Sequence, residues 1–334
     1  MDFRQIRRQQ FLTEDRYVAA KKRLPEEIAY FALNPVGSGA SEAESEMLAR
    51  LLSAEQRYDL LSLRYTGGEP IELLREELEE VVLAYERYGE QLWRYRSNRN
   101  EFVFDPQNID EYCQLLQLVG LCFLLHRRDL LKRISVLQDG EDGANGGADN
   151  LYEELMSHGL GADSRYESDW ISAAEPYQAL SDALYSETND EAIQHLHHFL
   201  QRWYKDLAGT AWHDSHKPDD AGRQGGYYGY WSFEAGAAVL LLGIEDDSSL
   251  HQYLYYPKDL VAWARANSVL SEDITGTNKV IFLRCPGGDP CPKSGYWSTP
   301  AKVNSRRQFK QGETMPNFES SYGATIWQCD IAQS

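Results

Sequence analysis

Histidines supply the side chains in this sequence that are best suited to acid–base chemistry or metal binding. Five of them fall close together: His195, His197, His198, His213 and His216. On a helix, His195 and His198 would be neighbours, and His213 or Asp214 could complete a metal site with them. No H-E-x-x-H spacing or paired set of acidic ligands accompanies them, which favours surface or capping histidines. A metal-dependent enzyme using His195, His198, His213 and Asp214 is the alternative.

The remaining patterns give no positive case for catalysis. Cys285, Cys291 and Cys329 lack the paired C-x2–4-C spacing of a zinc knuckle, which favours structural cysteines. The sequence contains no G-x-S-x-G, no P-loop and no G-x-G-x-x-G. We therefore predict a protein that is not an enzyme and has no catalytic residues, metal or cofactor.

The compartment is indicated by what the chain does not contain. The five cysteines are odd in number and unevenly spaced, so they do not suggest a disulfide framework. No apolar run approaches the roughly 18 residues of a transmembrane helix, and the first residues lack the apolar region of a secretory signal. These features predict a cytoplasmic protein.

Negative charge is concentrated in one part of the chain. Residues 139–190 contain 13 acidic residues and one basic residue, Arg165, which gives −12 of the total net charge of −19. We call this segment the acidic belt. Such a field repels nucleic acid and membrane surfaces and attracts a basic partner, although a merely solubilising surface is the alternative.

Helical periodicity dominates the first 270 residues. Helices are predicted over about 41–65, 71–95, 110–134, 171–186 and 189–208, with another over 231–243 and one that begins at Pro257. The strongest pattern is a seam of apolar residues spaced three and four apart, which is typical of an antiparallel bundle or, alternatively, of a dimer face. Its members are Ile71, Leu74, Leu78, Val81, Tyr85, Tyr88, Leu92 and Tyr95.

Two further segments interrupt the helical pattern. Residues 139–150 contain four glycines and four acidic residues, which predicts a flexible linker or exposed loop between two helical halves. After about residue 270, strands are predicted over 278–285 and 324–329, with short ones near 296–298 and 307–310. The fold class is therefore mainly α, a two-part helical bundle with a small β-rich, barrel-like module at the C-terminal end.

Two stretches of sequence resemble known proteins. The run Tyr227-Tyr228-Gly229-Tyr230-Trp231-Ser232-Phe233-Glu234-Ala235, together with Tyr255-Tyr256-Pro257-Lys258-Asp259-Leu260, resembles the helical domain of PoNi-like immunity proteins, which neutralise bacterial nuclease toxins delivered to competitors. The tail, from Cys291-Pro292-Lys293-Ser294-Gly295-Tyr296-Trp297 to Gly323-Ala324-Thr325-Ile326-Trp327, is similar to a module found in proteins of polymorphic and type VI secretion toxin loci. The resemblance implies inhibition by tight binding.

With this resemblance, four regions are expected. They are an N-terminal helical region (1–138), an acidic Gly-rich linker (139–150), a PoNi-like helical region (151–270) and the β-rich module (271–334). The leading hypothesis is an immunity protein whose acidic belt binds a basic toxin surface. The predicted contact residues concentrate the charge of the belt: Glu153, Glu154, Asp163, Glu167 and Asp169. A scaffold that dimerises through the 71–95 seam is a further alternative.

Overall fold

The protein folds into two compact units, Met1–Ile274 and Thr275–Ser334. The computed structural model describes residues 2–218 and 226–270, and residues 284–330 except 292–293, 300–301, 303–304 and 319–324. Helices make up most of the described part, so the prediction of a mainly helical protein is confirmed. The finer division into four regions stays a prediction. No helix in the described ranges is both long and apolar enough to cross a membrane.

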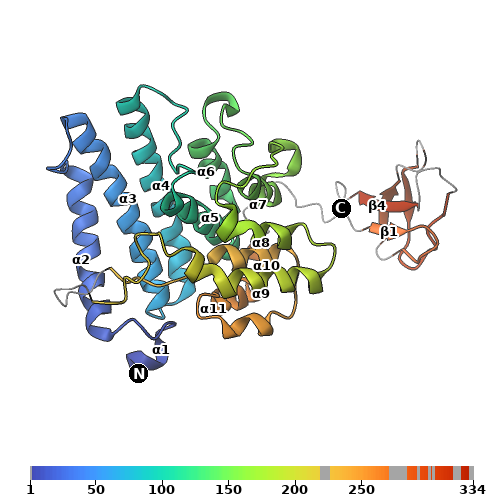
Figure 1. Cartoon of the computed structure of the whole chain (residues 1–334). Helices are drawn as coiled ribbons and strands as arrows, with labels where there is room; N and C mark the ends of the chain where they lie inside the picture. Colours follow the sequence, from blue (N-terminus) through green and yellow to red (C-terminus); the bar gives the residue numbers. More distant parts are fainter. Residues whose placement is uncertain are drawn as a thin grey trace. The chain divides into compact units, whose positions relative to one another are not determined.

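Three long helices form the N-terminal part of the first unit (Figure 1). After the short α1 (Phe3–Ile6), these are α2 (Glu14–Leu33), α3 (Glu42–Thr66) and α4 (Ile71–Arg96). The structure confirms the predicted 41–65 and 71–95 helices. The seam along α4 is buried from Ile71 to Leu92, and α4 packs against α3 and α6 (Leu131–Gln138). Because the seam is used inside the chain, it is not an available dimer face.

The single helix predicted over 110–134 is wrong. The chain instead forms α5 (Ile109–Leu124), a 3-10 turn η1 (Arg128–Leu130) and α6. The break occurs at His126, which has a left-handed φ of 51° that ends helical hydrogen bonding. Its Nε2 lies 2.7 Å from the carbonyl oxygen of Ala264, so a distant segment of the chain stabilises the turn.

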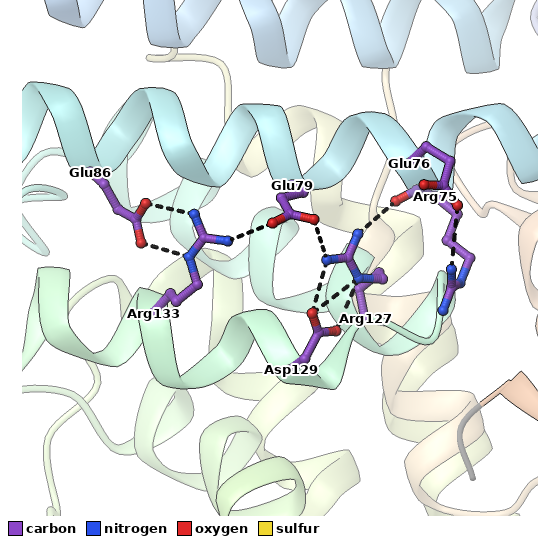
Figure 2. A network of polar contacts seen from close by, with 7 residues as sticks. All are labelled: Arg75, Glu76, Glu79, Glu86, Arg127, Asp129 and Arg133. Atoms are coloured by element: carbon purple, nitrogen blue, oxygen red, sulfur yellow. Dashed lines mark hydrogen bonds and ion pairs between the residues drawn. The ribbon is translucent and has the colours of Figure 1, made fainter. Parts of the chain in front are cut away.

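Ion pairs connect α4 to the segment after this break (Figure 2). The Arg133 guanidinium lies 2.6 Å from the Glu86 carboxylate and 3.2 Å from that of Glu79. Arg127 lies 2.9 Å from Glu79 and 2.8 Å from Asp129, and these hydrogen bonds raise its pKa despite burial. Glu79 is therefore shared by two arginines, which fixes the η1–α6 segment along α4.

The second half of this unit consists of shorter helices around the same core. They are α7 (Asn150–Leu160), α8 (Ala174–Leu184), α9 (Asn189–Asp206), α10 (Phe233–Leu241) and α11 (Lys258–Ala266), with 3-10 turns η2 (Glu141–Gly143), η3 (Ala162–Ser164) and η4 (Ser248–Gln252). Gly120 permits α5 to contact α10, since a Cβ there would lie 2.8 Å from the Glu234 nitrogen. Buried apolar residues from both halves form one continuous core. The aromatic run 227–233 belongs to it.

The second unit contains a four-stranded antiparallel sheet in the order β1-β4-β2-β3. The strands are β1 (Arg284–Pro286), β2 (Gly295–Ser298), β3 (Arg307–Phe309) and β4 (Ile326–Asp330). The strands predicted near 296–298, 307–310 and 324–329 are confirmed, whereas most of 278–285 lies outside the described residues. The barrel is not supported, because β1 and β3 are opposite edges of the described sheet. The small core of this unit contains Trp297 from β2 and Trp327 from β4.

Candidate protein-binding surface

The five acidic residues singled out in the sequence surround one hollow of about 640 Å³ at the surface of the first unit. Glu153 and Glu154 come from α7, whereas Asp163, Glu167 and Asp169 come from the loop between α7 and α8. The loop residues are exposed, and Glu154 is half-buried. The hydrogen bond with His158 lowers the pKa of Glu154. A cluster predicted from charge alone is thus also a cluster in space.

The basic residue of the acidic belt points into the protein. Only 4% of the Arg165 side chain is exposed, and its guanidinium lies 2.7 Å from carboxylate oxygens of both Asp139 and Glu153. Burial opposes the charge of Arg165, but the hydrogen bonds that it donates to Asp139 and the charges of the two nearby carboxylates raise its pKa overall. The single basic side chain of the belt is therefore paired with carboxylates inside the protein.

Glu153 fixes the loop instead of facing a partner. Its residue exposure is 5%, and besides Arg165 it accepts hydrogen bonds from the backbone nitrogens of Gly147 (2.9 Å) and Tyr166 (3.3 Å). Two of these three partners, Arg165 and Tyr166, line the hollow. The sequence placed Glu153 among the contact residues, and the structure places it beneath them.

Two residues at the start of α7 hold the far end of the same loop. The Asn150 side chain donates to the carbonyl oxygen of Ser168, and its backbone nitrogen donates to that of Trp170, both at 2.6 Å. The Asp149 carboxylate caps α7 through the Tyr152 nitrogen and also accepts from the Ser172 nitrogen at 2.7 Å. A loop held at this many points loses little conformational freedom when a partner binds.

The Gly-rich segment 139–150 packs against the loop between α7 and α8. A Cβ at Gly146 would lie 2.5 Å from the Tyr166 ring, and one at Gly147 would lie 2.7 Å from the carbonyl oxygen of Glu167. Gly147 also has a φ of 75°, which side chains other than glycine rarely adopt. The glycines predicted as a linker thus permit close contact with the loop.

Three exposed aromatic side chains accompany the acidic residues, and the sequence reasoning missed them. Tyr166 (41% exposed) and Tyr185 (55%) line the hollow, and Trp170 (66%) lies next to it. Exposed tyrosine and tryptophan are the residues most enriched among the strongest contacts of protein interfaces. The available signal was a tryptophan directly after Glu167-Ser168-Asp169, in a stretch without apolar periodicity.

The histidines do not form a metal site in the described residues. No group of three or more His, Cys, Asp or Glu side chains there could hold a metal ion. His195 approaches Asp182 at 3.9 Å, whereas His197 bonds to Tyr253 and Ser249, and His213 stacks on Tyr204. His195, His197 and His213 thus contact other protein groups, His198 is exposed, and the proposed set of four is not assembled.

Comparison with known proteins identifies one family that is similar to part of the chain. Residues 147–260 match the family described as PoNe immunity proteins (PoNi), C-terminal, a range that includes the hollow and its exposed aromatic residues. The resemblance seen in the sequence is confirmed over these residues, which are similar to the C-terminal domain of the PoNi immunity proteins, a family that implies protection against a toxin.

A solved structure supports the fold over a longer range. The crystal structure of protein PA2201 from Pseudomonas aeruginosa is 21% identical, covers 78% of this chain and 92% of its own, and superimposes with a TM-score of 0.60. At this identity the match concerns the fold. No curated protein matches the sequence.

Proposed function

We propose that this chain is an immunity protein that neutralises a cognate toxin, a nuclease delivered by type VI secretion, by binding it in the cytoplasm. The binding surface is the hollow with its acidic loop and exposed aromatic residues. The toxin contributes a basic surface, as a nuclease that contacts phosphates would. The chain acts by occlusion, without turnover or a cofactor.

The observation that carries this proposal is the inward position of Arg165. Because that guanidinium is buried against Asp139 and Glu153, every charged side chain that the loop from 161 to 172 exposes is acidic. Such a field accelerates the encounter with a basic protein and disfavours nucleic acid. The exposed rings of Tyr166, Trp170 and Tyr185 then supply the apolar contact area that charge alone lacks.

The contact residues are proposed with one change of role. Asp163, Glu167 and Asp169 face the solvent on the loop, and Glu154 borders the hollow from α7. These four are assigned to the toxin. Glu153 is assigned to holding the loop through Arg165, because its carboxylate is already occupied.

The test uses a candidate toxin, sought in the gene next to the one that encodes this chain. Co-expression with this chain should restore the growth that the toxin abolishes, and the purified proteins should form a complex. The triple reversal Asp163→Lys, Glu167→Lys and Asp169→Lys should slow association by about tenfold or more at low salt and weaken the salt dependence.

A matched control separates the local field from net charge. Glu26, Glu42 and Glu46 are exposed acidic residues on α2 and α3, and their reversal to lysine changes the net charge equally. Equal slowing by both triple variants would assign the effect to net charge. Unchanged association in the loop variant would make the belt merely solubilising, and absence of both complex and protection would overturn the proposed function.

A further inference from the structure

A second cavity, separate in its lining from the acidic hollow, opens between α3, the start of α5 and the segments 211–215 and 226–231. Its volume is about 460 Å³. Its walls combine six aromatic rings with four carboxylates. The rings are those of Tyr58, Trp203, Trp212, Tyr228, Tyr230 and Trp231, and the carboxylates are those of Glu55, Asp59, Asp110 and Glu111.

One face of α3 supplies the first wall. Glu55, Tyr58, Asp59 and Ser62 are spaced i, i+3, i+4 and i+7, which places them on one side of the helix. Glu55 and Asp59 are half-buried on this face, where a charged carboxylate is stabilised by a hydrogen bond or a counter-charge. Burial raises the pKa of Asp59 well above its usual range. The negative charge of Glu55 raises this pKa further, and the positive charge of Arg23 lowers it. Among the described residues, neither Glu55 nor Asp59 receives a hydrogen bond that would offset its burial.

The opposite walls are rigid. Asp110, in the first turn of α5, accepts from the Ala211 nitrogen at 2.8 Å, which ties the 211–215 segment to that helix. Trp212 stacks on Trp203 with ring centroids 5.2 Å apart. Trp231 donates to Thr66 Oγ1 at 2.8 Å, and the hydroxyl of Tyr58 bonds to Gln117. The cavity is therefore held open by contacts between its own walls.

We infer that this cavity is a binding site for an organic cation, a guanidinium or alkylammonium group. Aromatic faces and carboxylates both attract such a cation, and a cavity of this size encloses the head and its aliphatic stem. A neutral or anionic ligand would leave the two α3 carboxylates half-buried without a counter-charge. The cation has two sources, a free amine or a side chain of the toxin, and the inference does not depend on toxin binding.

The test begins with the isolated protein and a matched pair of small ligands. Argininamide carries the guanidinium, and citrullinamide replaces it with a neutral urea of nearly the same shape. Calorimetry and the fluorescence of the lining tryptophans should show argininamide binding at least about tenfold more tightly than citrullinamide. Equal binding of the two ligands, or no binding of either, would overturn the inference.

Charge-neutral variants locate the site. Asp59→Asn and Glu55→Gln should each weaken argininamide binding by about tenfold, because each removes a charge from a poorly solvated wall. Glu46→Gln removes an exposed charge from the same helix and should change the affinity less than about twofold. Equal affinities of all three variants would place any bound cation elsewhere and refute the assignment. Unfolding temperatures establish that each variant is folded.

Proton release provides a signature that nonspecific attraction would not give. Burial, with help from Glu111 and Asp110, raises the pKa of Glu55 to about 7, and Asp59 is raised as well. Within the described part of the chain, the charged groups that act on this pair are Asp110 and Glu111 from α5 and Arg23 from α2. A bound cation favours the ionised carboxylates, so binding should tighten from pH 6 to pH 8 and release protons. Argininamide binding that is independent of pH would contradict this site.

A second arm distinguishes the two sources of the cation. If the toxin inserts a side chain, excess argininamide should compete with the toxin, and Asp59→Asn should weaken the complex. If argininamide binds without affecting the toxin, the cavity serves a free amine.

Discussion

The Arg165 guanidinium lies against the Glu153 carboxylate, with Nε and Oε2 2.8 Å apart, and both side chains are almost completely buried. The same guanidinium reaches Asp139 across the base of the loop. This arrangement stabilises the segment that carries the exposed acidic residues, so the position of that acidic surface depends on the buried ion pairs. Four predictions follow from this surface and from the core beneath it.

Replacing Arg165 by methionine should destabilise the fold. The substitution keeps much of the side-chain volume but leaves Asp139 and Glu153 buried without a counter-charge, which costs about 3–5 kcal/mol. Denaturant unfolding measures the loss. Adding Glu153→Gln and Asp139→Asn should recover part of it, whereas Asp163→Asn on the exposed loop should change stability by less than about 0.5 kcal/mol. A stability of Arg165→Met equal to that of the parent would contradict the supporting role.

Trp170→Ala should weaken toxin binding without affecting the free protein. The ring is 66% exposed, so its removal should cost less than about 0.5 kcal/mol of stability. At an interface, a buried tryptophan typically contributes about 2 kcal/mol or more, mostly through slower dissociation. Surface plasmon resonance measures both rates. Tyr30→Ala on α2 removes another exposed ring and serves as the control; equal effects of the two variants would argue against this surface.

Gly147→Ala tests whether the Gly-rich segment 139–150 restrains the loop between α7 and α8. At a φ of 75°, alanine is strained, and its Cβ would lie 2.7 Å from the Glu167 carbonyl oxygen. We expect a loss of about 1–3 kcal/mol and faster amide hydrogen exchange across residues 161–172. Gly37→Ala is the control, because nothing lies within 4 Å of the added Cβ. Unchanged exchange in the loop would show that the Gly-rich segment does not restrain it.

Glu234→Gln should make stability less dependent on pH. Glu234 is fully buried, and Trp203 and Ser232 donate to one carboxylate oxygen. The other oxygen has no hydrogen-bond partner among the described residues. Burial, partly offset by these bonds, raises its pKa to about 7. The folded state therefore holds this proton more tightly than the unfolded state. Its stabilising effect is complete below pH 4.5 and disappears as the pH rises to about 7.

The measurement compares the parent with Glu234→Gln at pH 5 and pH 8. Relative to the variant, the parent should lose on the order of 3 kcal/mol of unfolding free energy between these values. Glu46→Gln, at an exposed site, should show no such difference. A gap between parent and Glu234→Gln that is the same at both pH values would contradict the raised pKa.

Local patterns predicted most of the helices, because each helix buries one stripe and leaves a period of 3.6 residues in the sequence. The seam from Ile71 to Leu92 and the helix over 189–208 follow this rule. The break at His126 could not be predicted in this way. It depends on the carbonyl of Ala264, which lies 138 residues further along the chain.

The sequence by itself determined that the protein is mainly helical, that most of its net negative charge lies in residues 139–190, and that it resembles an immunity family. These properties reside in composition, period and local motif. Only the tertiary structure decided which charges reach the solvent, because burial depends on neighbours distant in sequence. It turned Arg165 inward and Trp170 outward, and it brought Glu55 and Asp59 of α3 opposite Asp110 and Glu111 of α5.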